Sequence, residues 1–146
     1  GFLGDKERLP REVREALEQA QNSTAANDKM TLNIAVNYGG RDEIIRTIRT
    51  LAEKVQGGEL LPDMIDEAAF SAQLDTGGQA DPDLLIRPSG EKRISNFLLW
   101  QSAYTELYFS DKLWPDFSKR DLLTAILDFQ GRRRRFGKTQ EQIVKE

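Results

Sequence analysis

Residues 81–109 read DPDLLIRPSGEKRISNFLLWQSAYTELYF and contain the pattern that decides the fold. The mostly apolar segment 83–87 lies between two prolines and predicts a short buried strand that ends at Arg87. A second apolar segment, 106–109, predicts another strand, which Glu106 begins. In open α/β sheets, ligands bind at the carboxyl ends of the strands. The sequence therefore predicts a binding site at Arg87.

The loop that follows Arg87 is rich in hydrogen-bond donors. Arg93 and Ser95 follow a Pro-Ser-Gly turn, and we expect free backbone amides in the loop between and after the two arginines. Two guanidiniums, a hydroxyl and such amides suit a phosphate or a carboxylate. The alternative is structural: Arg87 could pair with Glu91 or Asp83, since ordinary ion pairs form similar clusters. Spacing alone does not decide between these two interpretations.

The rest of the chain alternates between helical and strand patterns, as an α/β protein requires. A mostly parallel central sheet flanked by helices is therefore expected. Apolar residues at helical spacing predict helices that begin near Pro10 and cover 41–56, 63–72 and 118–133. Residues 31–36 alternate like a strand, and 74–82 are typical of a loop.

Three further segments each allow two interpretations. The turn Asn37-Tyr38-Gly39-Gly40-Arg41 precedes a helix, so its amides could bind a phosphate, or its glycines could simply make a tight turn. Ser95 and Asn96 could cap a helix that begins in the apolar run 97–100, or Ser95 could serve both as a cap and as a ligand of the anion. The apolar residues of 97–100, together with Tyr104, could line a prenyl channel, but we assign them to the core and to a dimer contact.

Composition limits the chemistry that the chain can carry. The 146 residues are 38% hydrophobic and 31% charged, which is typical of a globular protein. The chain has no cysteine and no histidine, so disulfides, thiolate metal sites and histidine bases are excluded. Arginine, carboxylates, serine and backbone groups remain. This set suits an anionic substrate and a hard cation such as magnesium.

The run Arg132-Arg133-Arg134-Arg135 suggests nucleic-acid binding at first sight. A net charge of −3 and the lack of a wider basic face argue against it, so we expect no nucleic-acid partner. Basic residues in the last turn of a helix also complement the helix dipole. No apolar run approaches the length of a membrane span.

Residues 86–109 resemble the signature of the cis-prenyltransferases, the undecaprenyl diphosphate synthase family. Four further blocks agree in the same order, so the resemblance covers nearly the whole chain. These blocks are Gly4-Asp5, Leu32 to Ala35 with Asn37 to Arg41, Leu113 to Phe117, and Arg134 to Gly137. The resemblance implies an incomplete undecaprenyl diphosphate synthase-like fold, with residues 1–146 as the C-terminal portion of a single catalytic domain.

One family segment has no counterpart in this sequence. Family members carry Asp-Gly-Asn-Gly-Arg near their N-terminus, and its aspartate is central to magnesium and diphosphate chemistry. The chain begins instead in what resembles a strand from the middle of the fold. The resemblance therefore implies that the catalytic aspartate lies upstream and that none of these 146 residues is catalytic. We expect this portion to be inactive alone.

The resemblance also implies an activity and site residues. The intact enzyme would join isopentenyl diphosphate to an allylic diphosphate such as farnesyl diphosphate, giving a long-chain cis-polyprenyl diphosphate and pyrophosphate. The product would be undecaprenyl diphosphate, a lipid carrier for cell-wall synthesis. Arg87, Arg93 and Ser95 would bind isopentenyl diphosphate, together with Arg135 and Gly137 of an Arg-x-Gly element. Glu106 would bind Mg²⁺, although a plain strand-edge glutamate is the alternative.

Partners and location follow from the same resemblance. We expect a homodimer in which Arg135 serves the diphosphate site of the partner subunit. A cytoplasmic enzyme that visits the membrane surface would suit a lipid product. The alternative function is a non-catalytic accessory subunit of a cis-prenyltransferase complex. The sequence does not specify product length or the allylic primer.

Overall fold

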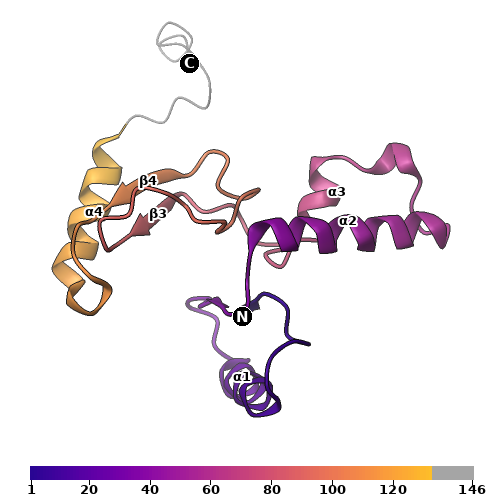
Figure 1. Ribbon diagram of the computed structural model, residues 1–146, viewed down its shortest axis with the longest axis horizontal. Coiled ribbons are helices and arrows are strands. Elements are labelled where there is room, and N and C mark those ends of the chain that lie inside the picture. Colours follow the sequence, from indigo (N-terminus) through magenta and orange to yellow (C-terminus); the bar gives the residue numbers. More distant parts are fainter. Residues whose placement is uncertain (133–146) are drawn as a thin grey trace, which may run out of the picture. The chain divides into compact units, whose positions relative to one another are not determined.

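The computed structural model describes residues 1–132. Within them the chain forms two compact units. The first unit contains residues 1–80 together with 96–100, and the second contains 81–95 together with the described residues from 101 to 132. Each unit has one pair of parallel strands accompanied by helices (Figure 1).

The first unit is mainly helical. Its strands pair in parallel, with Phe2 opposite Ile34, and α2 and α3 lie side by side (Figure 1). The elements in chain order are β1 (Phe2–Leu3), α1 (Arg11–Thr24), β2 (Ile34–Ala35), α2 (Gly40–Gln56), the 3₁₀ helix η1 (Pro62–Met64) and α3 (Glu67–Ser71).

The second unit consists of a strand pair and one helix. β3 (Leu84–Arg87) and β4 (Glu106–Phe109) are parallel and in register, with Leu84 opposite Glu106 and Arg87 opposite Phe109. The 3₁₀ helix η2 (Trp114–Asp116) and helix α4 (Lys119–Gly131) follow. A capping box formed by Ser118 and Asp121 begins α4.

The structure confirms the predicted α/β class, with parallel strands and flanking helices. It differs from the sequence prediction in detail. The four strands form two separate pairs, and the expected strand 31–36 is reduced to Ile34–Ala35. The expected helix 63–72 is two short helices, because the side chain of Asp66 accepts a hydrogen bond from the Ala69 amide and starts a new helix there.

Helix α2 buries a different face from the one that its isoleucines predict. Ile45 and Ile48 are 47% and 49% exposed. The buried residues of α2 are Gly40, Glu43, Thr47 and Leu51, which follow each other at intervals of three or four residues. A carboxylate therefore lies in the interior of the first unit and needs hydrogen-bonding partners.

Candidate diphosphate site

Arg87 lies at the carboxyl end of β3, as predicted. Its carbonyl accepts a hydrogen bond from the Ser110 amide at 2.9 Å, which continues the pairing with the chain beyond β4. The side chain is half-buried. Within residues 1–132 the Arg87 guanidinium makes no ion pair, so its charge is available to an anion.

Two amides of the loop after Arg87 are not free, contrary to the expectation from the sequence. The Ser89 amide donates to the Lys112 carbonyl at 2.6 Å, and the Gly90 amide donates to the Ser110 carbonyl at 2.9 Å. Ser89 and Gly90 have φ values of 79° and 71°, so both lie in the left-handed region. This conformation directs the two amides toward residues 110–112. These two amides are therefore not available to a ligand.

The other two predicted clamp residues are exposed. Arg93 forms an ion pair with Glu91, and its side chain remains 66% exposed. Glu91 therefore pairs with Arg93. It does not form the ion pair with Arg87 that the structural interpretation of the sequence had suggested. Exposed ion pairs contribute little stability, so a phosphate could replace Glu91 at small cost. Ser95 is also exposed, with a left-handed φ of 47°.

Glu106 lies at the other end of the strand pair from Arg87. The register places it opposite Leu84, three residues or about 10 Å before Arg87 along the sheet. Its carboxylate accepts a hydrogen bond from Arg132 Nη1 at 2.9 Å. Arg132 also donates to the Leu107 carbonyl and to Asp128, and the two carboxylates raise the pKa of Arg132.

Within residues 1–132, Glu106 is the carboxylate that β4 itself could contribute to magnesium binding. Its oxygens are hard ligands of the kind that Mg²⁺ prefers. No group of three or more acidic, histidine or cysteine side chains is arranged to hold a metal in the described part of the chain. A metal at Glu106 would need its other ligands from elsewhere.

The predicted turn 37–41 has a structural role in the first unit. The Gly40 amide donates to the Asn96 carbonyl at 2.7 Å, and the Arg41 amide donates to Asn96 Oδ1 at 2.9 Å. These amides belong to the first turn of α2, so the atoms that could have held a phosphate already have partners. Asn96 thus caps α2. It does not cap a helix at 97–100, because that segment forms turns.

The apolar residues after Asn96 pack within the first unit. The Phe97 ring meets Tyr38 edge-on, with ring centroids 5.6 Å apart. Trp100 lies 4.4 Å from Phe70 between centroids, and its Nε1 donates to Ser71 at 2.9 Å. These contacts agree with the interpretation of 97–100 as packing residues. The core assignment is wrong for Tyr104, which is 70% exposed.

Sequence reasoning missed a polar network around Glu43, which is only 1% exposed. Glu43 accepts hydrogen bonds from the Asp75 amide at 2.9 Å and from the Tyr38 hydroxyl at 2.5 Å. The Asp75 carboxylate in turn accepts from both terminal nitrogens of Arg46 and from the Gly4 amide. The signal in the sequence was the spacing of Gly40, Glu43, Thr47 and Leu51. The network joins β1, α2 and the loop at residue 75.

The free energy of unfolding is expected to fall above about pH 10, where tyrosine ordinarily titrates. Burial, together with the hydrogen bond to Glu43, raises the pKa of Tyr38 well above its usual range. The folded protein then keeps a proton that the unfolded chain releases, so stability declines as pH rises. Urea unfolding between pH 8 and 11 should show a shallower decline in Tyr38→Phe than in wild type. Tyr104→Phe, at a site 70% exposed, should match wild type. Equal slopes in all three proteins would contradict this coupling.

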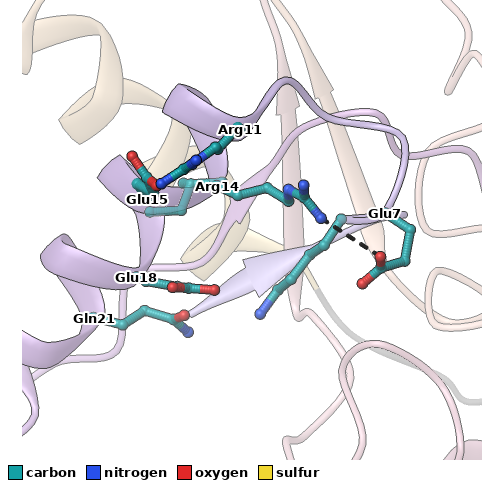
Figure 2. A pocket seen from close by; sticks show the side chains of 8 residues that line it. Glu7, Arg11, Arg14, Glu15, Glu18 and Gln21 are labelled. Atoms are coloured by element: carbon teal, nitrogen blue, oxygen red, sulfur yellow. Dashed lines mark hydrogen bonds and ion pairs between the residues drawn. The ribbon is translucent and has the colours of Figure 1, made fainter.

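Two surface hollows lie beside α1. One, of about 300 Å³, is lined mainly by charged side chains that pair among themselves: Arg14 with Glu7 at 3.5 Å and Arg11 with Glu15 at 2.6 Å (Figure 2). The other, of about 450 Å³, has a mixed polar and apolar lining that includes Leu17, Gln21 and Met30. Because both charge signs are compensated in the first hollow, it offers no evident site for an anion.

Two predicted site residues, Arg135 and Gly137, lie outside the described residues. Of the helices that the structure describes, none is both long and apolar enough to cross a membrane.

Comparison with known proteins identifies the class. Residues 1–137 match the family described as "Putative undecaprenyl diphosphate synthase". This chain belongs to the undecaprenyl diphosphate synthase family, which confirms the resemblance. It is 52% identical over 136 residues to an isoprenyl transferase of Prochlorococcus marinus subsp. pastoris, covering 93% of this chain and 50% of the relative. It is 49% identical over 145 residues to a ditrans,polycis-undecaprenyl-diphosphate synthase ((2E,6E)-farnesyl-diphosphate specific) of Pseudomonas aeruginosa, covering 99% and 58%.

Solved structures agree. Lavandulyl diphosphate synthase from Lavandula x intermedia, in complex with dimethylallyl diphosphate, is 46% identical with a TM-score of 0.92 over 94% of this chain and 59% of that one. A probable undecaprenyl diphosphate synthase from Campylobacter jejuni is 39% identical with a TM-score of 0.80, covering 94% and 62%. The chain thus spans about half to three fifths of the relatives it matches.

Proposed function

We propose that the intact protein elongates prenyl chains in the cis configuration. It would condense isopentenyl diphosphate with an allylic diphosphate such as farnesyl diphosphate, releasing pyrophosphate. The observation that carries this proposal is Arg87: a guanidinium without an ion pair in residues 1–132, at the carboxyl end of β3, in a member of this family. The activities after which these relatives are named support the same reaction class.

In this proposal, three side chains hold the diphosphate of isopentenyl diphosphate. Arg87 and Arg93 supply charge-assisted hydrogen bonds, and Ser95 adds a hydroxyl donor. Holding this diphosphate aims the alkene of the second substrate at the reacting carbon of the first, which lowers the entropic part of the barrier. Residues 1–146 would carry this one diphosphate site, and the catalytic aspartate and the allylic site would lie in the other part of the family domain.

Magnesium would be the cofactor, and Glu106 would be one of its ligands. When bound, Mg²⁺ would neutralise charge on a diphosphate. The hydrogen bond to Arg132 uses Glu106 Oε2, so one carboxylate oxygen is outside that bond. Because Glu106 lies at the opposite end of the strand pair from Arg87, it would act on the ion and not directly on the diphosphate that Arg87 holds.

We further infer a homodimer in which Arg135 and Gly137 complete the diphosphate site of the partner subunit. The product would be undecaprenyl diphosphate for cell-wall lipid carrier synthesis, made by a cytoplasmic enzyme that contacts the membrane surface. The second candidate is a non-catalytic accessory subunit. The presence of Arg87, Arg93, Ser95 and Glu106 together favours the enzyme, because an accessory subunit needs no such clamp.

The test is incorporation of labelled isopentenyl diphosphate by the intact natural protein, with farnesyl diphosphate as primer and with Mg²⁺ or EDTA. Long-chain product that requires Mg²⁺ is expected. Glu106→Gln should lower kcat about 100-fold, since it removes one charged metal ligand. Glu53→Gln, which changes an exposed glutamate of α2, should match wild type. A protein that is inactive alone but stimulates a homologous subunit would be the accessory partner, and product formation in EDTA would contradict the magnesium proposal.

A further inference from the structure

We propose that Asn96 is a positioning residue for Arg93 and Ser95, the two members of the isopentenyl diphosphate clamp that directly precede it in the chain. It caps helix α2 and thereby fixes the C-terminal end of the loop that carries Arg93 and Ser95. This inference rests on the proposed function, and it assigns Asn96 a role that the clamp residues themselves do not fill.

The first line of support is the pair of hydrogen bonds to α2. The Asn96 carbonyl accepts from the Gly40 amide at 2.7 Å, and Asn96 Oδ1 accepts from the Arg41 amide at 2.9 Å. Amides in the first turn of a helix lack partners within the helix, so they bind an external acceptor strongly. Residue 96 is therefore held by two bonds to a helix that lies 55 residues earlier in the chain.

The second line of support is the close fit of the Gly39-Gly40 backbone against Asn96 and Leu99. A Cβ atom added to Gly39 would lie 2.8 Å from Asn96 Nδ2. A Cβ atom added to Gly40 would lie 2.7 Å from Leu99 Cγ and 3.1 Å from the Asn96 carbonyl oxygen. The two glycines therefore leave the space that Asn96 and Leu99 occupy. A side chain at residue 39 or 40 would collide with Asn96 or Leu99, so the two glycines allow this contact.

The third line is backbone conformation. Ser95, Asn96 and Leu98 have φ values of 47°, 64° and 45°, all in the left-handed region. For residues with a side chain this region costs about 1–2 kcal/mol each, and asparagine tolerates it best. Such a segment persists only where its surroundings hold it. The bonds from Asn96 to α2 and the packing of Trp100 on Phe70 supply that restraint.

The consequence for the site follows from covalent connection. Ser95 precedes Asn96 by one peptide bond, and Arg93 precedes it by three residues. Fixing Asn96 limits the conformations that both can adopt, so less entropy is lost when they bind a diphosphate. Without the Asn96 side chain the loop would have to be ordered by the substrate itself. That cost falls on binding and leaves the chemical step unchanged.

The test compares Asn96 variants of the intact enzyme. Asn96→Ala removes the side-chain acceptor and should raise KM for isopentenyl diphosphate about tenfold, with kcat and the KM of the allylic substrate within about twofold of wild type. Asn96→Asp keeps the acceptor and should restore KM to within about threefold. Asn33→Ala is the matched control, because it also removes a long-range asparagine hydrogen bond in the first unit, to Gln79, and it should match wild type.

Direct binding separates this inference from the proposed function. Calorimetry with isopentenyl diphosphate alone measures binding without turnover. If wild type binds isopentenyl diphosphate but makes no product, the proposed function is contradicted. The comparison of its affinity with that of Asn96→Ala still tests the inference. Hydrogen exchange should also be faster at residues 93–95 in Asn96→Ala. Unchanged isopentenyl diphosphate affinity in that variant would overturn the inference. The inference would also be overturned if Asn96→Ala lost affinity equally for isopentenyl diphosphate and for the allylic substrate. The same holds if Asn96→Asp lost as much affinity as Asn96→Ala.

Discussion

Replacing Arg87 by alanine is expected to lower kcat/KM for isopentenyl diphosphate about 100- to 1000-fold. Two charge-assisted hydrogen bonds from one guanidinium contribute about 3–4 kcal/mol, and each 1.4 kcal/mol is a factor of ten. The fold should survive, because the Arg87 carbonyl and not its side chain bonds to the Ser110 amide. Steady-state kinetics of the intact protein, beside a thermal unfolding curve, would measure both effects.

Two variants make the Arg87 result specific. Arg87→Lys keeps the charge but loses the planar fork, so it should recover only part of the activity. Arg120→Ala removes an exposed arginine from α4 in the same unit and should stay within about twofold of wild type. If Arg87→Ala binds isopentenyl diphosphate as wild type does, the clamp assignment is wrong. A proportional loss in Arg120→Ala would instead indicate a general effect of charge.

Replacing Glu43 by alanine is expected to have the largest effect on stability. The change leaves the Asp75 amide and the Tyr38 hydroxyl without their acceptor inside the first unit. Each unpaired buried donor costs about 1–3 kcal/mol, so we expect the free energy of unfolding to fall by about 3 kcal/mol. The measurement is urea denaturation of wild type and variant at neutral pH.

Controls for Glu43 come from the same helix. Glu43→Gln keeps an acceptor oxygen of similar shape and should cost about 1 kcal/mol. Glu53→Ala, at an exposed position of α2, should change stability by less than about 0.5 kcal/mol. An equal effect of Glu43→Ala and Glu53→Ala would show that the network around Glu43 does not hold this unit together.

Much of the local structure was readable from the chain because it depends on near neighbours. The period of apolar residues located α2 and α4, and the bounding prolines located β3. The same pattern misjudged burial: Leu127 on α4 is 67% exposed, whereas Ala125 is fully buried. Periodicity identifies a helix, but the surface that packs against it selects the buried face. The expected helix 63–72 failed for a local reason, the cap at Asp66.

The candidate site divides in the same way. Arg87 at a strand end, and the nearness of Arg93 and Ser95 along the chain, follow from the sequence, because strand direction and short loops are local properties. The pairing of Glu106 with Arg132 joins residues 26 apart, and the bond from Arg41 to Asn96 joins residues 55 apart. Hydrogen-bond partners at such separations leave no periodic signal.

The sequence by itself determined the α/β class, the family and the guanidiniums that face a diphosphate in our proposal. Only the tertiary structure decided which polar groups remain available to a ligand. It assigned the amides of Ser89, Gly90 and Arg41 to acceptors within the chain, and it left the Arg87 guanidinium without an ion pair in the described residues. The physical reason is that a backbone amide donates to whichever acceptor the fold brings close to it, and that acceptor depends on the three-dimensional contacts of distant segments.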